Sequence, residues 1–116
     1  MSERRGKYNA RKTTVDNVVF ASKRESERYK ELKLLHAAGK ITLLELQPKF
    51  ELQPAFRHRQ SGKMIRSINY IADFEYMDND YNHIVEDVKG AETEVFRIKR
   101  KLFLRQYPHI DFRIVK

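Results

Sequence analysis

Apolar and polar residues alternate most strictly between residues 67 and 77. One face of this segment carries Ile68, Tyr70, Ala72, Phe74 and Tyr76, and the other carries Asn69, Ile71, Asp73 and Glu75. A period of two is typical of a β-strand with one buried face. The polar turn at 78–82 and a second extended run at 83–89 then predict a hairpin, which ends at Gly90.

Two other segments show helical spacing. The capping box Ser22-Lys-Arg-Glu25 predicts the start of a helix over 23–38, which Gly39 ends. A second helix is predicted over 92–106, and Pro108 ends it. The expected apolar stripes are Leu32, Leu35 and Ala38 in the first helix, and Val95, Ile98 and Leu102 with neighbouring Phe96 and Phe103 in the second.

Short extended segments complete the pattern. Prolines 48 and 54 exclude helix over 41–48 and 49–54, residues 60–63 predict a turn between strands, and 110–115 predicts a last strand. The resulting order is αβββαβ, which predicts an α/β fold with a central mixed sheet flanked by helices. We expect a basic arm over 1–14 and a single domain over 15–116.

Composition agrees with one folded domain. The chain has 116 residues, of which 41% are hydrophobic, and this length suits a single core. There is no cysteine, which excludes disulfides, thiol catalysis and cysteine-based zinc sites. No apolar run approaches the roughly 18 residues of a membrane-spanning helix, and the N-terminus lacks the apolar stretch of a signal peptide. We therefore expect a cytoplasmic protein that does not bind a membrane.

Charge is uneven along the chain. Lys and Arg number 24 against 16 Asp and Glu, and the net charge of +8 favours a polyanionic partner, with nucleic acid ahead of an anionic membrane surface. Residues 73–94 hold eight acids and a single base, Lys89. The basic residues around this acidic segment are Arg4, Arg5, Lys7, Arg11 and Lys12; Arg57, Arg59, Lys63 and Arg66; and Arg97, Lys99, Arg100, Lys101 and Arg105. They are candidate phosphate contacts, although ordinary solvated faces would show the same pattern.

The hairpin gives the acids a geometry. If its turn is symmetric about residue 80, Asp73 faces Asp87, while Asp87 and Lys89 share a face. Two facing carboxylates repel each other, so a folded protein that keeps them needs a compensating cation. Mg²⁺ suits such a pair because it takes one or two carboxylates and can share a phosphate. A lysine beside it could assist phosphodiester hydrolysis.

These features resemble the PD-(D/E)XK nuclease superfamily, and more closely a family of short phage and prophage proteins described as Holliday-junction-resolvase-like. The motifs that carry the resemblance are Lys7-Tyr-Asn-Ala, Phe20-Ala-Ser-Lys-Arg-Glu25, Leu46-Gln-Pro-Lys-Phe50, Tyr70-Ile-Ala-Asp-Phe74, Asp87-Val-Lys-Gly90 and Thr93-Glu-Val-Phe96. Ala72 replaces the usual proline before the first aspartate. The resemblance implies that Glu25, Asp73 and Asp87 bind Mg²⁺ or Mn²⁺, and that Lys89 is the catalytic lysine.

Several candidates keep a second interpretation. Glu25 could serve only the capping box. Thr93 could cap the second helix and offer backbone N–H donors to a phosphate, or it could serve only as the cap. Lys99 could reach a phosphate, or its side chain could simply extend along its apolar neighbours to solvent. Gln47 and Glu75 are auxiliary candidates that strand packing also explains.

Three functions remain open. The first is a metal-dependent endonuclease acting on branched or double-stranded DNA, the second a DNA-binding module without catalysis, and the third an RNA-directed nuclease or a modification-related enzyme of the same fold. Cutting both strands of a junction requires two active sites, so we expect a homodimer.

Overall fold

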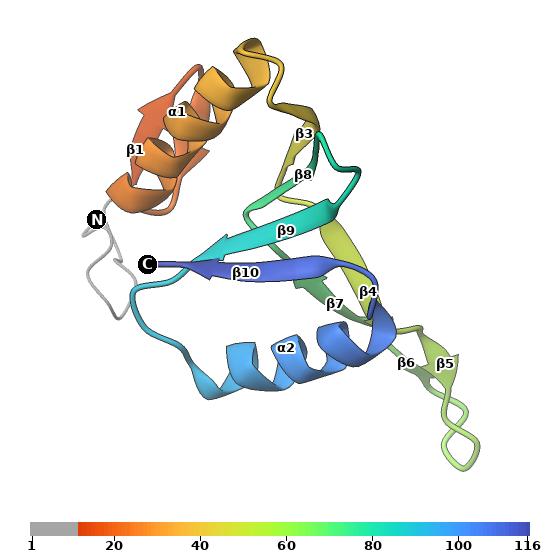
Figure 1. Ribbon diagram of the computed structural model, residues 1–116. Helices are drawn as coiled ribbons and strands as arrows, with labels where there is room; N and C mark the ends of the chain where they lie inside the picture. The colour runs from red at the N-terminus through yellow and green to blue at the C-terminus, as the bar shows by residue number, and fades with distance from the viewer. Residues whose placement is uncertain (1–11) are drawn as a thin grey trace, which may run out of the picture.

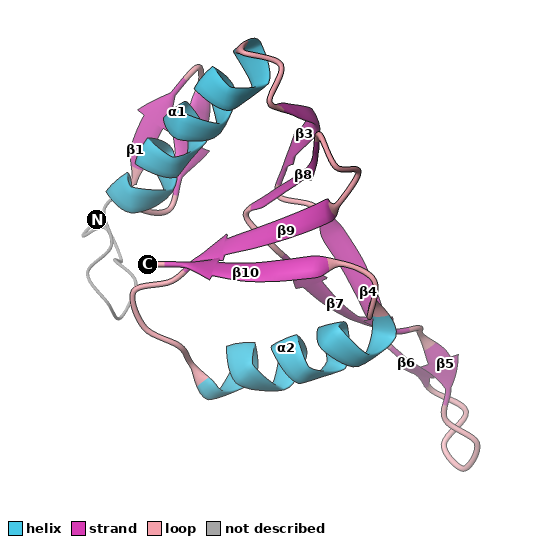
Figure 2. Ribbon diagram, viewed as in Figure 1, coloured by secondary structure: helices cyan, strands magenta, loops and turns pink. Residues whose placement is uncertain are grey.

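The computed structural model describes residues 12–116 and shows a four-stranded mixed sheet with two helices (Figures 1 and 2). The strand order is β10 (Asp111–Val115), β9 (His83–Val88), β8 (Phe74–Asp78) and β3 (Ile41–Leu46). β3, β8 and β9 pair antiparallel, whereas β10 runs parallel to β9. The predicted α/β class is confirmed.

Next to β3 and β8, the chain forms a second, two-stranded sheet, the β4–β7 ribbon. β4 (Lys49–Gln53) pairs with β7 (Ile68–Ile71), and the N–H groups of Gln47 and Ala72 donate to the carbonyls of Asp73 and Pro48, each at 3.0 Å. At the far end of this ribbon, β5 (Phe56–Arg57) and β6 (Met64–Ile65) form a short hairpin, as the turn at 60–63 predicted. Figure 1 shows this hairpin projecting away from the rest of the molecule.

A further hairpin precedes the first helix. β1 (Thr13–Val15) pairs with β2 (Val18–Phe20), so regular structure begins two residues before the expected start of the domain at residue 15. Arg4, Arg5 and Lys7 lie outside the described residues.

The first helix, α1 (Lys23–Ala37), has the predicted bounds but a different buried face. Ser22 is its N-cap, and the N–H of Lys40 bonds the Leu35 carbonyl past Gly39, which has a φ of 74°. The buried residues are Ser26, Tyr29 and Leu32, whereas Leu35 and Ala38 of the expected stripe are exposed. The reason is that only the N-terminal part of α1 packs against β1, β2 and β3.

The second helix, α2 (Glu94–Gln106), also buries a face that the spacing did not predict. Phe96 and Phe103 are buried, and Val95, Ile98 and Leu102 are exposed by 62%, 58% and 39%. Aromatic contacts decide this orientation, because Phe103 packs edge-on against Phe50 and Tyr70.

The alternating segment 67–77 serves two cores instead of one. Tyr70 and Ala72 pack with α2, whereas Phe74 and Tyr76 pack with α1. The chain leaves regular strand structure at Ala72 and Asp73, and this break turns the second half of the segment toward the other layer. The predicted alternation is confirmed by the burial of Tyr70, Ala72, Phe74 and Tyr76. The predicted single strand is wrong, and Asp73 lies where the two cores meet.

α1 and α2 lie on opposite sides of β9 and β10 (Figure 1). Within residues 12–116, neither helix has the length and apolar character needed to cross a membrane.

Candidate active site

Two successive carboxylates are buried in β9. Glu86 is 0% exposed and Asp87 is 2% exposed. Because neighbouring side chains of a strand point to opposite faces, Glu86 faces α1 and Asp87 faces the α2 side. Burial of an ionised carboxylate costs several kcal/mol unless it is paired and hydrogen-bonded. Each residue must therefore find its own partners on its own face.

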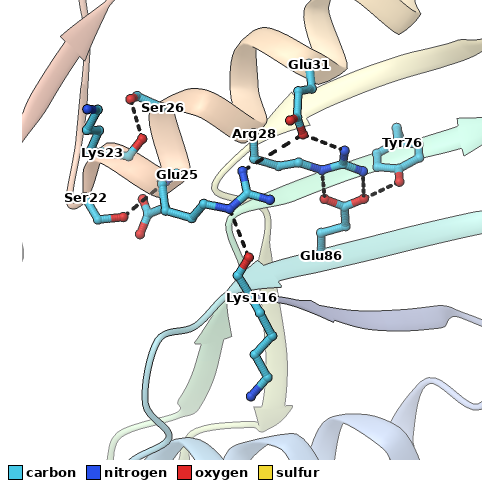
Figure 3. Close-up of polar contacts among 10 residues, drawn as sticks. Ser22, Lys23, Glu25, Ser26, Arg28, Glu31, Tyr76, Glu86 and Lys116 are labelled. Carbon is cyan, nitrogen blue, oxygen red and sulfur yellow. Dashed lines mark hydrogen bonds and ion pairs between the residues drawn. The ribbon is translucent and has the colours of Figure 1, made fainter.

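The partners of Glu86 saturate its carboxylate. Arg28 donates from Nε to Oε1 at 2.8 Å and from its terminal nitrogen to Oε2 at 2.7 Å, and the Tyr76 hydroxyl also donates to Oε2 (Figure 3). Burial, followed by this hydrogen bond, raises the pKa of Tyr76 to about 12. Arg28 also binds Glu31 at 3.0 Å. This network joins α1 to β9 and leaves Glu86 no free oxygen for chemistry.

The carboxylate of Asp87 has fewer hydrogen-bond partners than that of Glu86. Its Oδ2 accepts from the Tyr70 hydroxyl, and its Oδ1 lies 3.2 Å from Lys89 Nζ. The Lys89 ammonium also lies 4.7 Å from the centre of the Phe96 ring. The predicted shared face of Asp87 and Lys89 is confirmed, because a direct ion pair joins them.

Asp73 adds a second carboxylate beside Asp87. The pairs Phe74 with Glu86 and Tyr76 with Ile84 have the predicted register. Asp73 directly precedes β8, near enough to Asp87 for the charge of Asp87 to act on its carboxyl. Asp73 Oδ2 accepts from the Val88 N–H at 2.7 Å. Burial first, and then the negative charges of Asp87 and Glu25, raise the pKa of Asp73 from 3.8 to about 8. In the absence of a bound cation, these effects favour the protonated form of Asp73.

Glu25 approaches this pair from α1. Its backbone N–H donates to Ser22 Oγ at 3.1 Å, which confirms the N-cap. Burial raises the pKa of the Glu25 carboxyl, a backbone hydrogen bond at Ala21 lowers it, and the charge of Asp87 raises it again. Glu25 thus forms part of the cap and also lies within the electrostatic field of Asp87.

A cleft of about 590 Å³ opens beside these groups. Its lining includes Ser22, Glu25, Val88, Lys89, Thr93 and Lys116. It lies between the start of α1 and the segment that joins β9 to α2, and Arg24 Nε donates to the Lys116 carbonyl at its edge. A substrate in this cleft would meet Glu25, Lys89 and the first turn of α2.

The donor set fits a hard cation bound by few protein ligands. Among residues 12–116, no three histidine or acidic side chains are grouped closely enough to hold a metal together. The partly buried Asp73 and the buried Asp87 do form a pair of oxygen donors, and Mg²⁺ commonly uses only one or two carboxylates while keeping several waters. The pair fits Mg²⁺, and Glu25 does not complete a three-carboxylate group.

The predicted basic contacts fall into distinct groups. On α2, Arg97 and Arg100 lie 3.7 Å and 3.2 Å from Glu92, Lys99 is half-buried and Lys101 is exposed. Thr93 caps α2, with its Oγ1 accepting from the Phe96 N–H at 3.1 Å, and also lines the cleft. Arg57, Arg59 and Lys63 lie apart from the cleft, on the β5–β6 hairpin.

Two auxiliary candidates have other partners. Glu75 Oε2 lies 2.5 Å from His83 Nε2, so this carboxylate is paired away from Asp73. Gln47 has a φ of 51°, and its backbone bonds the Asp73 carbonyl while its side chain is exposed. Gln47 thus supports the strand break at Asp73 through its backbone.

Four important residues were not predicted from the sequence: Tyr70, Tyr76, Arg28 and Glu86. The two tyrosines stood in the alternating segment, where their hydroxyls gave no signal of a partner. Arg28 follows Glu25 by one helical turn, and this spacing was the one local indication that it also faces the sheet.

Comparison with protein-family models matches residues 5–116 to a family described as "Protein of unknown function (DUF1064)". Neither the curated proteins nor the solved structures gave a match.

The raised pKa of Asp73 predicts a pH-dependent stability. The unfolded carboxyl titrates near 3.8 and the folded one near 8, so the folded state retains a proton that the unfolded state loses in this window. In the absence of metal, the contribution of Asp73 to stability should fall as pH rises from about 4 to 8. In thermal unfolding with EDTA, the melting temperature of Asp73→Asn relative to that of the parent should rise across this pH range. An equal difference at pH 5 and pH 8 would contradict the raised pKa.

The hydrogen bonds and ion pair of the buried Glu86 carboxylate predict how substitutions of its partners change stability. Arg28→Met alone should lower the free energy of unfolding by about 3–5 kcal/mol, because it leaves a buried carboxylate without its cation. Arg28→Met combined with Glu86→Leu and Tyr76→Phe should recover most of this loss, since all three polar groups are then removed. Urea unfolding measures both. A triple variant as unstable as Arg28→Met would show that the ion pair is not the source of the effect.

Proposed function

The chain belongs to the DUF1064 family of unknown function, and we propose from its cleft that it is a metal-dependent endonuclease of the PD-(D/E)XK type that acts on DNA. One observation carries the proposal. Asp73, directly before β8, lies beside Asp87 on β9, and the Lys89 ammonium is 3.2 Å from Asp87. Lys89 and Glu25 line the cleft next to them. Two carboxyl groups this close together, one of them almost completely buried, are costly to fold, and phosphodiester hydrolysis gives them a use.

The fold supports the same proposal. β3, β8 and β9 form the antiparallel part of the sheet, with Asp73 directly before β8 and Asp87 on β9. α1 precedes these strands, and α2 and β10 follow them. This order and the positions of the acids agree with the nuclease superfamily that the motifs resemble.

Asp73 and Asp87 would hold Mg²⁺ or Mn²⁺. Glu25 would contribute negative charge from the cleft beside them, without binding the ion directly. The ion would supply a positive charge to a phosphate and lower the pKa of water near it. Tyr70 and Val88 keep the two carboxylates in place through their hydrogen bonds. Lys89 can donate to phosphate oxygens as negative charge develops on them.

The first turn of α2 offers a further phosphate contact. Thr93 caps this helix beside the cleft, and backbone N–H groups at a helix N-terminus favour an anion. Lys99 and Lys101 on the same helix add positive charge. Arg97 and Arg100 share Glu92, so their availability to phosphate depends on breaking that pair.

The alternative is a DNA-binding module without catalysis. The net charge of +8 supports either function. The Asp73–Asp87 pair favours catalysis, because binding to a polyanion gains nothing from two apposed carboxylates. We further propose that the enzyme acts in the cytoplasm on branched or duplex DNA, as a homodimer that brings two active sites to two strands.

Catalysis predicts losses at three residues. Asp73→Asn and Asp87→Asn should abolish cleavage, and Lys89→Ala should lower it by about 100- to 1,000-fold because transition-state charge loses a donor. Mg²⁺ should raise the melting temperature of the parent and of Lys89→Ala, and much less that of either Asp variant. Plasmid and four-way-junction cleavage, with calorimetry, measures these effects.

Glu45→Gln is the matched control, because it removes an exposed carboxylate on β3. It should cleave as the parent does. If the purified parent binds no Mg²⁺ and leaves every DNA form intact, the nuclease proposal fails and the DNA-binding module replaces it.

A second variant separates the two roles of Glu25. Glu25→Gln leaves the bond from its backbone N–H to Ser22, so the melting temperature should stay within about 2 °C of the parent, while cleavage should fall because the anionic charge is lost. Thermal unfolding and cleavage per folded molecule should be measured on the same sample. Lower stability with unchanged cleavage would assign Glu25 to the cap alone.

A further inference from the structure

The β5–β6 hairpin is the most exposed part of the described chain that keeps a regular structure. β5 and β6 pair only with each other, and every residue from 54 to 66 is exposed. The hairpin extends from the far end of the β4–β7 ribbon, away from α1 and from the end of β9 (Figure 1). Nothing in the core requires it, so its sequence is free to serve a contact.

Its charge is of one sign. Arg57, Arg59, Lys63 and Arg66 lie on it, and no acid occurs between residues 53 and 72. Within residues 12–116, none of these four cations forms an ion pair. Arg97 and Arg100 on α2 differ, since both lie close to Glu92. The hairpin is therefore a concentrated, unneutralised positive surface.

The tip of the hairpin is held in one conformation. Arg57 donates to the Gly62 carbonyl at 2.6 Å, His58 Nδ1 and Ser61 Oγ lie 2.7 Å apart, and the His58 N–H donates to the Lys63 carbonyl at 2.7 Å. Gly62 has a φ of 74°, which the tight turn requires. A preorganised tip loses less conformational entropy on binding than a loose loop does.

Apolar side chains accompany the cations. Phe56, Met64 and Ile65 are exposed by 46%, 55% and 39%, and Phe56 pairs with Ile65 across the hairpin. A two-stranded ribbon fits the major groove of duplex DNA, where cations reach phosphates and apolar groups meet base methyls. A symmetric contact with a second copy of the chain would instead place the four cations of one hairpin against those of the other.

The longest reach of the ribbon from the candidate active site is close to one turn of duplex DNA. Ten residues separate Lys63 from Asp73, and at about 3.3 Å per residue the ribbon reaches at most about 33 Å. One turn of B-DNA is about 34 Å long, or about 10 base pairs. We propose that the β5–β6 hairpin enters a groove of the bound duplex about one helical turn from the scissile phosphate. The enzyme then requires an intact duplex arm on that side of the cut.

The position of the cut rests on the proposed nuclease function, but the DNA contact of the hairpin does not. The test variant is Arg59→Gln/Lys63→Gln, which leaves the structural bond of Arg57 intact. The matched control is Lys30→Gln/Lys40→Gln, which removes the same charge from exposed positions on α1 and the loop after it. Circular dichroism should show that both variants are folded.

Binding is measured in EDTA by fluorescence anisotropy on duplexes of increasing length and at several salt concentrations. The slope of log affinity against log salt should become shallower by about 2 for the hairpin variant, since two phosphate contacts are lost, and should not change for the control. Parent affinity should fall when the duplex arm is shorter than about 10 base pairs, whereas the hairpin variant should respond little to this length.

An unchanged slope in the hairpin variant overturns the proposal. So does a parent that binds no duplex, or a parent dimer that the hairpin variant converts to monomer, which would assign the hairpin to a second copy of the chain.

If the binding effects appear and no DNA is cleaved with Mg²⁺, the nuclease function fails while the hairpin contact stands. If cleavage occurs with no dependence on arm length in either protein, the groove contact one turn away fails while the nuclease function stands.

Discussion

The burial of two adjacent carboxylates in β9 is the constraint on which the arrangement of the site depends. Glu86 and Asp87 are both almost completely buried, and strand geometry sends them to opposite faces. Each face must therefore supply a cation and a hydroxyl. Arg28 and Tyr76 do so for Glu86, and Lys89 and Tyr70 do so for Asp87. The first group ties α1 to the sheet, and the second forms the site.

The two groups differ in how completely they neutralise their carboxylate. Arg28 binds both oxygens of Glu86, and this geometry is the stronger and more directional form of an ion pair. Asp87 has a single ammonium at one oxygen and lies near Asp73, whose pKa is raised by burial and then by the charge of Asp87. The remaining negative charge is what a cation and a phosphate could use. Although the two carboxylates are equally buried, their different partners give Glu86 a structural role and make Asp87 the candidate for chemistry.

The break at Ala72 and Asp73 links the site to the rest of the fold. It passes the chain from the α2 core to the α1 core, so Asp73 lies at the junction of both layers. It also lets the β4–β7 ribbon leave the central sheet and carry the β5–β6 hairpin away from α1 and from the end of β9 (Figure 1). One irregularity therefore places the first carboxylate and directs the basic hairpin.

The sequence alone determined the local features of this protein. The turn at 78–82 set the register that brings Asp73 near Asp87, and Ser22, Gly39 and Thr93 marked helix ends through bonds within a few residues. Only the tertiary structure decided which helix faces are buried, where segment 67–77 changes core, and that Arg28 neutralises a carboxylate 58 residues away. The physical reason is range. Turns and caps depend on neighbouring backbone groups, whereas a buried charge or a helix face depends on whichever distant segment packs against it.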